Sequence, residues 1–225
     1  MVVGTDLYIM NSGVGISVID TTTDTLTTTV SNSDFSFAST QLVGTKLYVT
    51  QFGSSQVVVI DTLTHTIINT IPVGSYPLKS VLVGTKLYIN QQNSIGIIDT
   101  TTDTVIGSIS TPGYNSGIEP MVVGTKMYID TYEYANSSTP STLSIIDTTT
   151  DTIVGVVPLG GYPSQHLDAK LVGNNIYVGN HQNHTLSVID TTTDTLVHTV
   201  TPYTMNQSLN SSTAVGTKLY VNDPG

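Results

Sequence analysis

Short runs of alternating apolar and polar residues, separated by turn-forming residues, fill the chain. Residues 78–83 alternate loosely and end at a Gly-Thr dipeptide, after which residues 86–90 resume the pattern. Two further runs, residues 95–99 and 104–109, flank a turn that begins with an aspartate. β-Prone runs split by short turns are typical of hairpins. This stretch therefore predicts four short antiparallel strands.

The same pattern recurs with a period of about 40 residues, which indicates an array of identical units. A Val-Gly-Thr-Lys-Leu-Tyr-Val phrase occurs in near copies at residues 3–9, 43–49, 83–89, 123–129, 172–178 and 215–221. An Ile-Asp-Thr-Thr-Thr-Asp-Thr phrase begins at Ile19, Ile60, Ile98, Ile146 and Ile189. Four strands per unit predict an all-β fold, a β-propeller of four-stranded antiparallel blades with five full repeats plus a partial sixth. We expect residues 1–225 to form a single β-propeller domain.

Both ends of the sequence fall inside the repeat. Residue 1 lies within a first strand, and the sixth unit stops after its second strand. The two ends supply the same pair of strands and cannot complete each other. Two explanations stay open: an excerpt of a longer chain, which the start inside a repeat favours, or self-assembly in which another protomer completes the incomplete last blade.

The net charge of −10 is mainly a by-product of the repeat, because nine of the sixteen acidic residues belong to the Ile-Asp-Thr phrase. Nucleic acid is disfavoured as a partner, since its binding needs a basic stripe. The chain has no cysteine, and only 10% of its residues are charged. A neutral surface rich in hydroxyl groups is commoner on secreted and cell-surface proteins. No apolar run reaches the length of about 20 residues that a membrane span needs.

The Asp-Thr-Thr-Thr-Asp segment has a local explanation. Aspartate at the first position of a turn accepts hydrogen bonds from backbone N–H groups two residues on, and threonine hydroxyls do the same. The alternative, a calcium site at Asp20 and Asp24, lacks the further oxygen ligands and the glycine of an EF-type loop. The pattern thus predicts turn chemistry, and we expect no metal and no cofactor.

The repeat resembles the YVTN β-propeller family, often found in archaeal and bacterial surface-layer-like proteins. The matching segments are residues 48–51, 88–90, 177–180 and 220–222, with residues 188–191 and 195–197 resembling the second half of that repeat. The proline that precedes the first strand in that family is kept as Pro77 and Pro163 and is missing around residues 35–38 and 208–213. The resemblance covers nearly the whole chain and implies surface placement and binding more than any reaction.

Candidate binding residues lie in the connections that vary between repeats. The Gly-Thr and Asp-Thr turns lie at one end of each blade, and the variable loops at the other, where function is commoner. Aromatic residues in the loops between blades could stack on sugars or grip a peptide, or pack over their own blade: Phe35 or Phe37, then Tyr76, Tyr114, Tyr162 and Tyr203. Polar residues that follow each second strand would stand near the channel top and bind a carbohydrate or water: Asn11, Gln51, Asn90, Asp130, Asn180 and Asn222.

Three further features stand out in the variable loops. An insertion over residues 131–140 carries Tyr132, Glu133 and Tyr134, which suit a contact patch or a tolerated surface insertion. His181 and His184 share a loop, but no third ligand is fixed by the sequence. Glycosylation sequons occur at Asn136, Asn183, Asn206 and Asn210.

These observations favour a non-enzymatic extracellular or cell-surface β-propeller. It would serve as a structural, adhesion or protein-interaction module with protein or glycan partners and no catalytic residues. The alternative is an enzyme or small-ligand and carbohydrate binder that uses the channel-mouth loops. In that case the reaction would depend on His166, His181, Asp130 and Asp168.

Overall fold

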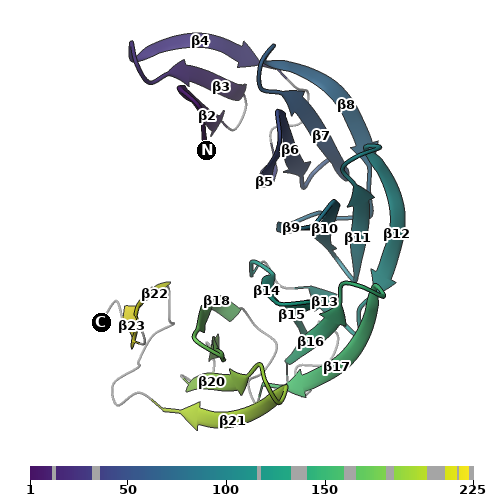
Figure 1. The fold of residues 1–225 in the computed structure, drawn as a ribbon, viewed down its shortest axis with the longest axis vertical. Coiled ribbons are helices and arrows are strands. Elements are labelled where there is room, and N and C mark those ends of the chain that lie inside the picture. Colours follow the sequence, from purple (N-terminus) through teal and green to yellow (C-terminus); the bar gives the residue numbers. More distant parts are fainter. Residues whose placement is uncertain are drawn as a thin grey trace. The chain divides into compact units, whose positions relative to one another are not determined.

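The repeat folds as expected into small antiparallel β-sheets. A computed structural model describes residues 1–11, 14–31, 36–115, 118–132, 141–159, 166–180, 185–201, 211–216 and 218–222. Every regular element in the described ranges is a β-strand, so the all-β prediction is confirmed (Figure 1). The chain divides into two compact units, residues 1–108 and 109–225. The single domain over residues 1–225 stays a prediction.

The first unit contains three sheets, which we number as blades 1 to 3. In each sheet the four strands lie side by side in chain order. Blade 1 holds β1 (Val2–Val3), β2 (Asp6–Asn11), β3 (Gly15–Asp20) and β4 (Thr25–Val30). Blade 2 holds β5 (Phe37–Val43), β6 (Lys46–Gln51), β7 (Gln56–Asp61) and β8 (Thr66–Pro72). Blade 3 holds β9 (Ser80–Val83), β10 (Lys86–Gln91), β11 (Ser94–Asp99) and β12 (Thr104–Ser110).

The second unit contains blades 4 and 5 and the described start of a sixth. Blade 4 holds β13 (Tyr114–Asn115), β14 (Met121–Val123), β15 (Lys126–Tyr132), β16 (Thr142–Asp147) and β17 (Thr152–Pro158). Blade 5 holds β18 (His166–Val172), β19 (Asn175–Asn180), β20 (Thr185–Asp190) and β21 (Thr195–Val200). The two-stranded sheet of β22 (Ser211–Val215) and β23 (Lys218–Asn222) fits the predicted partial blade.

The two repeated phrases form the turns that they predict. Gly44 and Thr45 connect β5 to β6 as a two-residue hairpin turn, and Gly44 has a φ of 59°. Glycine at the first central position is the requirement of a type II′ turn. In the second phrase, Asp20 Oδ1 accepts hydrogen bonds from the Thr22 backbone N at 2.8 Å and from Thr22 Oγ1 at 2.6 Å. The turn explanation of the Asp-Thr segment is confirmed at this position.

The apolar core lies between neighbouring blades. Successive residues of a strand point to opposite faces of its sheet, so within each unit two neighbouring blades contribute facing sets of side chains. At the blade 2–3 junction, Tyr48, Val57, Val59 and Ile71 pack against Leu87, Ile89 and Ile98. At the blade 4–5 junction, Tyr128, Leu143, Ile145, Val157 and Leu159 pack against Ile176, Val178 and Ile189.

Candidate functional site

Each junction between blades has two polar ends. The turn end holds the Gly-Thr and Asp-Thr turns, and the loop end holds the variable connections. Backbone hydrogen bonds run from Val73 N to Ser55 O and from Gln92 N to Ser75 O. Each joins a loop between two blades to a loop between the second and third strands of a blade, so both kinds of variable loop lie at the same end. The predicted separation of turns from variable loops therefore holds for this part of the chain.

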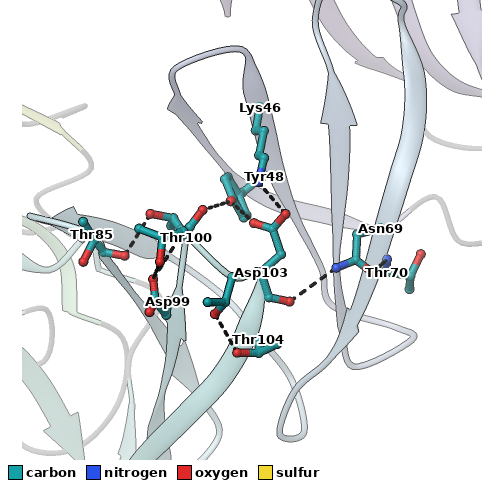
Figure 2. Close-up of polar contacts among 11 residues, drawn as sticks. Lys46, Tyr48, Asn69, Thr70, Thr85, Asp99, Thr100, Asp103 and Thr104 are labelled. Atoms are coloured by element: carbon teal, nitrogen blue, oxygen red, sulfur yellow. Dashed lines mark hydrogen bonds and ion pairs between the residues drawn. The ribbon is translucent and has the colours of Figure 1, made fainter.

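The turn end of the blade 2–3 junction is closed by a side-chain contact that crosses from one blade to the next. The Tyr48 hydroxyl of β6 donates to the Asp103 carboxylate, which also binds Lys46 Nζ at 2.6 Å (Figure 2). Asn69 Nδ2 donates to the Asp103 backbone oxygen at 3.3 Å. Burial and the hydrogen bond to Asp103 raise the pKa of Tyr48 above its ordinary value. The Tyr48 hydroxyl therefore stays protonated and donates its hydrogen to the Asp103 carboxylate.

The blade 4–5 junction repeats this turn-end contact. The Tyr128 hydroxyl donates to Asp194 Oδ1 at 2.7 Å, and Lys126 forms an ion pair with the same carboxylate. Burial and this hydrogen bond raise the pKa of Tyr128 in the same way.

At the blade 1–2 junction the acidic residue and the basic residue of the turn-end contact exchange positions. Asp6 stands at the lysine position and His65 at the aspartate position, with His65 Nε2 3.7 Å from Asp6 Oδ2. The Tyr8 hydroxyl lies 2.9 Å from His65 Nδ1. Burial, followed by the nearby charges of Asp6 and Asp61, raises the pKa of Tyr8 to about 12.

The polar residues that we expected after the second strands lie inside those strands instead. Gln51 and Asn180 are the last residues of β6 and β19, whereas Asn90 and Asp130 stand one or two positions before the ends of β10 and β15. All four are buried. Gln51 and Asn180 share one repeat position, and Asn90 and Asp130 share the position before it. The two pairs therefore point to opposite faces of their blades. They therefore do not form one common ring of side chains.

At the loop end of the blade 2–3 junction, internal hydrogen bonds satisfy the polar groups. Thr50 Oγ1 lies 3.2 Å from Ser39 O and 3.0 Å from Leu78 O. The Gln91 amide lies against the Cα atoms of Gly74 and Gly96, since a Cβ on either glycine would come within 2.2 Å of it. A long amide and two glycines therefore fill this end.

At the loop end of the blade 4–5 junction, different residues take these positions. Asp130 replaces Thr50, Asn180 replaces Gln91 and Ser187 replaces Gly96, as the strand registers show. Asn180 Nδ2 donates to Ser187 Oγ at 2.9 Å, and Ser187 Oγ donates to Leu159 O at 2.7 Å. Leu159 N in turn donates to Ser141 O at 2.8 Å. Asp130, Ser141, Asn180 and Ser187 are all buried.

Four of the predicted aromatic residues are described, and three of them, Tyr76, Tyr114 and Tyr132, contact another ring. Tyr76 is exposed and packs against Phe52 with a centroid distance of 4.9 Å and the two rings tilted by 50°. Tyr114 and Tyr132 form a cross-strand pair in blade 4 with a centroid distance of 6.1 Å. Sequence reasoning missed Phe52, although it occupies a variable loop. Phe37 packs against the core between blades 1 and 2.

Several predicted residues lie outside the described residues. They are Phe35, Glu133, Tyr134, Tyr162, His181, His184, Tyr203 and the sequon residues Asn136, Asn183, Asn206 and Asn210. Asn222 ends β23, and His166 and Asp168 lie in β18, with only their backbone described. Within the described ranges, no group of three or more His, Cys, Asp or Glu side chains could hold a metal ion.

The outermost strand of each blade carries exposed apolar side chains, which the sequence analysis did not single out. Val105 and Ile106 of β12 are 47% and 52% exposed. A cavity of about 430 Å³ between β8 and β12 is bordered by Asn69, Ile71 and Val105 among others. Corresponding exposed residues are Leu26 in β4, Ile67 and Ile68 in β8, Val154 and Val156 in β17, and Leu196 and Val197 in β21. Across the described part of the chain there is no helix that could span a membrane.

The fold and its repeated junctions define the class of this chain, a β-propeller with four-stranded blades. Among solved structures, it is similar to hydrazine synthase of Kuenenia stuttgartiensis, with 20% identity, a TM-score of 0.77, and 98% of this chain and 71% of that chain covered. It is also similar to BamB from Moraxella catarrhalis, with 16% identity, a TM-score of 0.71, and coverage of 98% and 68%. Identities this low support a shared fold alone.

No model of a known protein family and no curated protein matches the chain. The resemblance to the YVTN family therefore stays a prediction.

Proposed function

We propose that the chain is a non-enzymatic β-propeller module of the cell surface or extracellular space that acts by binding other proteins. The observation that carries the proposal is the set of exposed apolar residues on the outer strands. Val105 and Ile106 represent this set in blade 3. Exposed apolar groups that recur on a polar surface are typical of protein interaction sites.

The outer strands also lack the charges that keep strand edges apart. None of β4, β8, β12, β17 and β21 contains Lys, Arg, Asp or Glu. Charged residues, particularly lysine, are the usual protection of an edge strand against pairing with another chain. An extended segment of a partner could therefore add to such an edge and bury the apolar side chains at the same time.

Composition supports placement outside the cell. The surface is rich in Thr, Ser and Asn, only 10% of the residues are charged, and four glycosylation sequons are present. The similar solved structures include hydrazine synthase as well as BamB, so they favour neither an enzyme nor a binding module. The proposal of a non-enzymatic role rests on the outer strands.

The test of this function uses charge insertion at one edge. Val105→Lys combined with Ile106→Lys should weaken binding of the purified chain to envelope preparations of its source cells. The matched control is Thr101→Lys with Thr102→Lys, which adds the same charge to the exposed turn of the same blade. Cell fractionation should recover the native protein outside the cytoplasm. Equal binding by the two double variants, or a purely cytoplasmic protein, would refute the proposal.

The second candidate function is binding of a small ligand or carbohydrate at the variable loops. The observation that favours it is the exposed Phe52–Tyr76 pair, because aromatic faces stack on sugar rings. A screen of glycans should then find a ligand whose binding is lost in Phe52→Ala and kept in Leu63→Ala, a control at an exposed turn residue. A screen without a ligand would remove this candidate.

A further inference from the structure

The apolar contacts of the blade 1–2 and blade 4–5 junctions are nearly interchangeable. At the first junction Tyr8, Ile16, Val18 and Val30 pack against Leu47, Val49 and Ile60. At the second, the residues at the same repeat positions are Tyr128, Leu143, Ile145 and Val157 against Ile176, Val178 and Ile189. The two sets differ only by exchanges among Val, Leu and Ile, which cost a core little. Apolar packing therefore gives a blade little preference for one neighbour over another.

The turn-end contacts, in contrast, differ in charge. Asp6 occupies the repeat position of Lys46, because each is the partner of the aspartate that ends the third strand. His65 occupies the position of Asp103, at the end of the Asp-Thr turn. The side chains of Asp6 and His65 are 24% and 18% exposed, so water and salt screen their charges only in part.

This difference in charge penalises wrong neighbours of blade 1. If blade 1 packed against blade 3 or blade 5, the Asp6 carboxylate would lie beside the carboxylate of Asp103 or Asp194. Like charges that are brought together in an interface are strongly unfavourable. The imidazole of His65 carries no negative charge in either protonation state and therefore tolerates Asp6. A lysine such as Lys46 beside His65 would lose its ion pair with an aspartate.

We propose that Asp6 and His65 make the blade 1–2 junction selective, so that blade 1 packs on blade 2 and not on the equivalent face of another blade in its own chain or in a second copy. Repeat proteins misassemble by exchanging equivalent elements between copies. The selectivity comes from repulsion in the wrong pairs, because the correct contact is itself weak. His65 Nε2 lies 3.7 Å from Asp6 Oδ2, whereas Lys46 Nζ lies 2.6 Å from Asp103 Oδ2.

Refolding of the full chain from urea at a series of protein concentrations, followed by size-exclusion chromatography, tests the proposal. Asp6→Lys combined with His65→Asp recreates the contact of the blade 2–3 junction, so its free energy of unfolding should equal or exceed that of the wild type. The same variant should nevertheless yield a severalfold larger fraction of domain-swapped dimer, and this fraction should rise with protein concentration. Its three described turn-end contacts would all pair lysine with aspartate, and blade 1 would no longer be distinguished from blades 2 and 4.

Tyr8→Phe is the matched control, because it weakens the same junction without changing a charge. It should lower the free energy of unfolding and leave the dimer fraction at the wild-type value, which separates selectivity from stability. A double variant that refolds with the wild-type dimer fraction overturns the proposal. The proposal also fails if Tyr8→Phe forms as much dimer as the double variant, since the strength of the junction alone would then decide.

If the double variant does not fold, Asp6→Asn decides. Asparagine keeps the shape of the side chain and removes the charge that repels the aspartate of a wrong neighbour. This variant should form more dimer than the wild type, and an unchanged dimer fraction contradicts the proposal.

Discussion

The blade 2–3 and blade 4–5 junctions are alike at one end and different at the other. At the turn end both use a lysine and a tyrosine of one blade and an aspartate of the next, Lys46, Tyr48 and Asp103 in the first case. At the loop end Asp130 and Asn180 replace Thr50 and Gln91. The turn end joins these two pairs of blades in the same way, whereas the loop end differs between them.

At the loop end, the residues that differ between the two junctions compensate for one another in size. In blade 3 the long Gln91 side chain lies against Gly96, which has no Cβ to obstruct it. In blade 5 the amide is one methylene shorter, and the hydroxyl of Ser187 occupies the freed space and accepts its hydrogen bond at 2.9 Å. Gln91 fits beside Gly96, and Asn180 fits beside Ser187. Exchanging one residue of a pair between the blades should therefore destabilise the protein, whereas exchanging both should not.

The largest expected effect concerns the turn end. Tyr48→Phe and Tyr128→Phe should each lower the free energy of unfolding by about 1.5–3 kcal/mol, because each removes a buried hydrogen bond to a charged acceptor. Tyr8→Phe removes a hydroxyl that contacts the His65 imidazole and not a carboxylate, so it should cost only about 0.5–1.5 kcal/mol. Urea unfolding measures all three. If all three substitutions lowered the free energy of unfolding equally, the charge of the group that contacts the tyrosine hydroxyl would be unimportant.

A somewhat smaller effect is expected at the loop end of blade 3. Gly96→Ser places a Cβ 2.2 Å from Gln91 Nε2 and should cost about 1–2 kcal/mol through overpacking. Adding Gln91→Asn recreates the pair found in blade 5 and should recover most of this loss. Gly107→Ser is the matched control, since its Cβ would meet only Ile97 Cδ1 at 3.7 Å. A double variant less stable than Gly96→Ser would contradict the coupling.

The strands could be predicted well from the sequence because every repeat has the same short β-prone runs between the same turn residues. Runs expected at residues 95–99 and 104–109 correspond to β11 and β12 within one residue at each end. Periodicity says nothing about which side chains meet across blades, and the contact of Tyr48 with Asp103 spans 55 residues. One signal was present: Asp6 stands where four other repeats have lysine, and His65 stands where the other four repeats have aspartate.

The loop end was harder to predict for a physical reason. Gln51, Asn90, Asp130 and Asn180 are all polar and lie at or near the end of a second strand, so the sequence analysis grouped them as one set. A shift of one residue sends a side chain to the other face of the sheet. The register was needed to show that Asp130 and Asn180 belong to opposing faces of the same junction.

The smallest expected effect should be the same at both junctions, because it belongs to the turns alone. Hydrogen bonds from Thr101 and Thr192 hold the pKa of Asp99 and Asp190 below the ordinary value of 3.8. A lowered pKa in the folded state means that the stabilisation is complete above the ordinary value and disappears as the pH falls through the lowered one. Asp99→Asn and Asp190→Asn keep the acceptor oxygen but cannot titrate. Each should therefore lose less stability than the wild type when urea unfolding is repeated from about pH 5 down to about pH 2. A different pH response of the two variants would show that the stability of each turn also depends on the junction beside it.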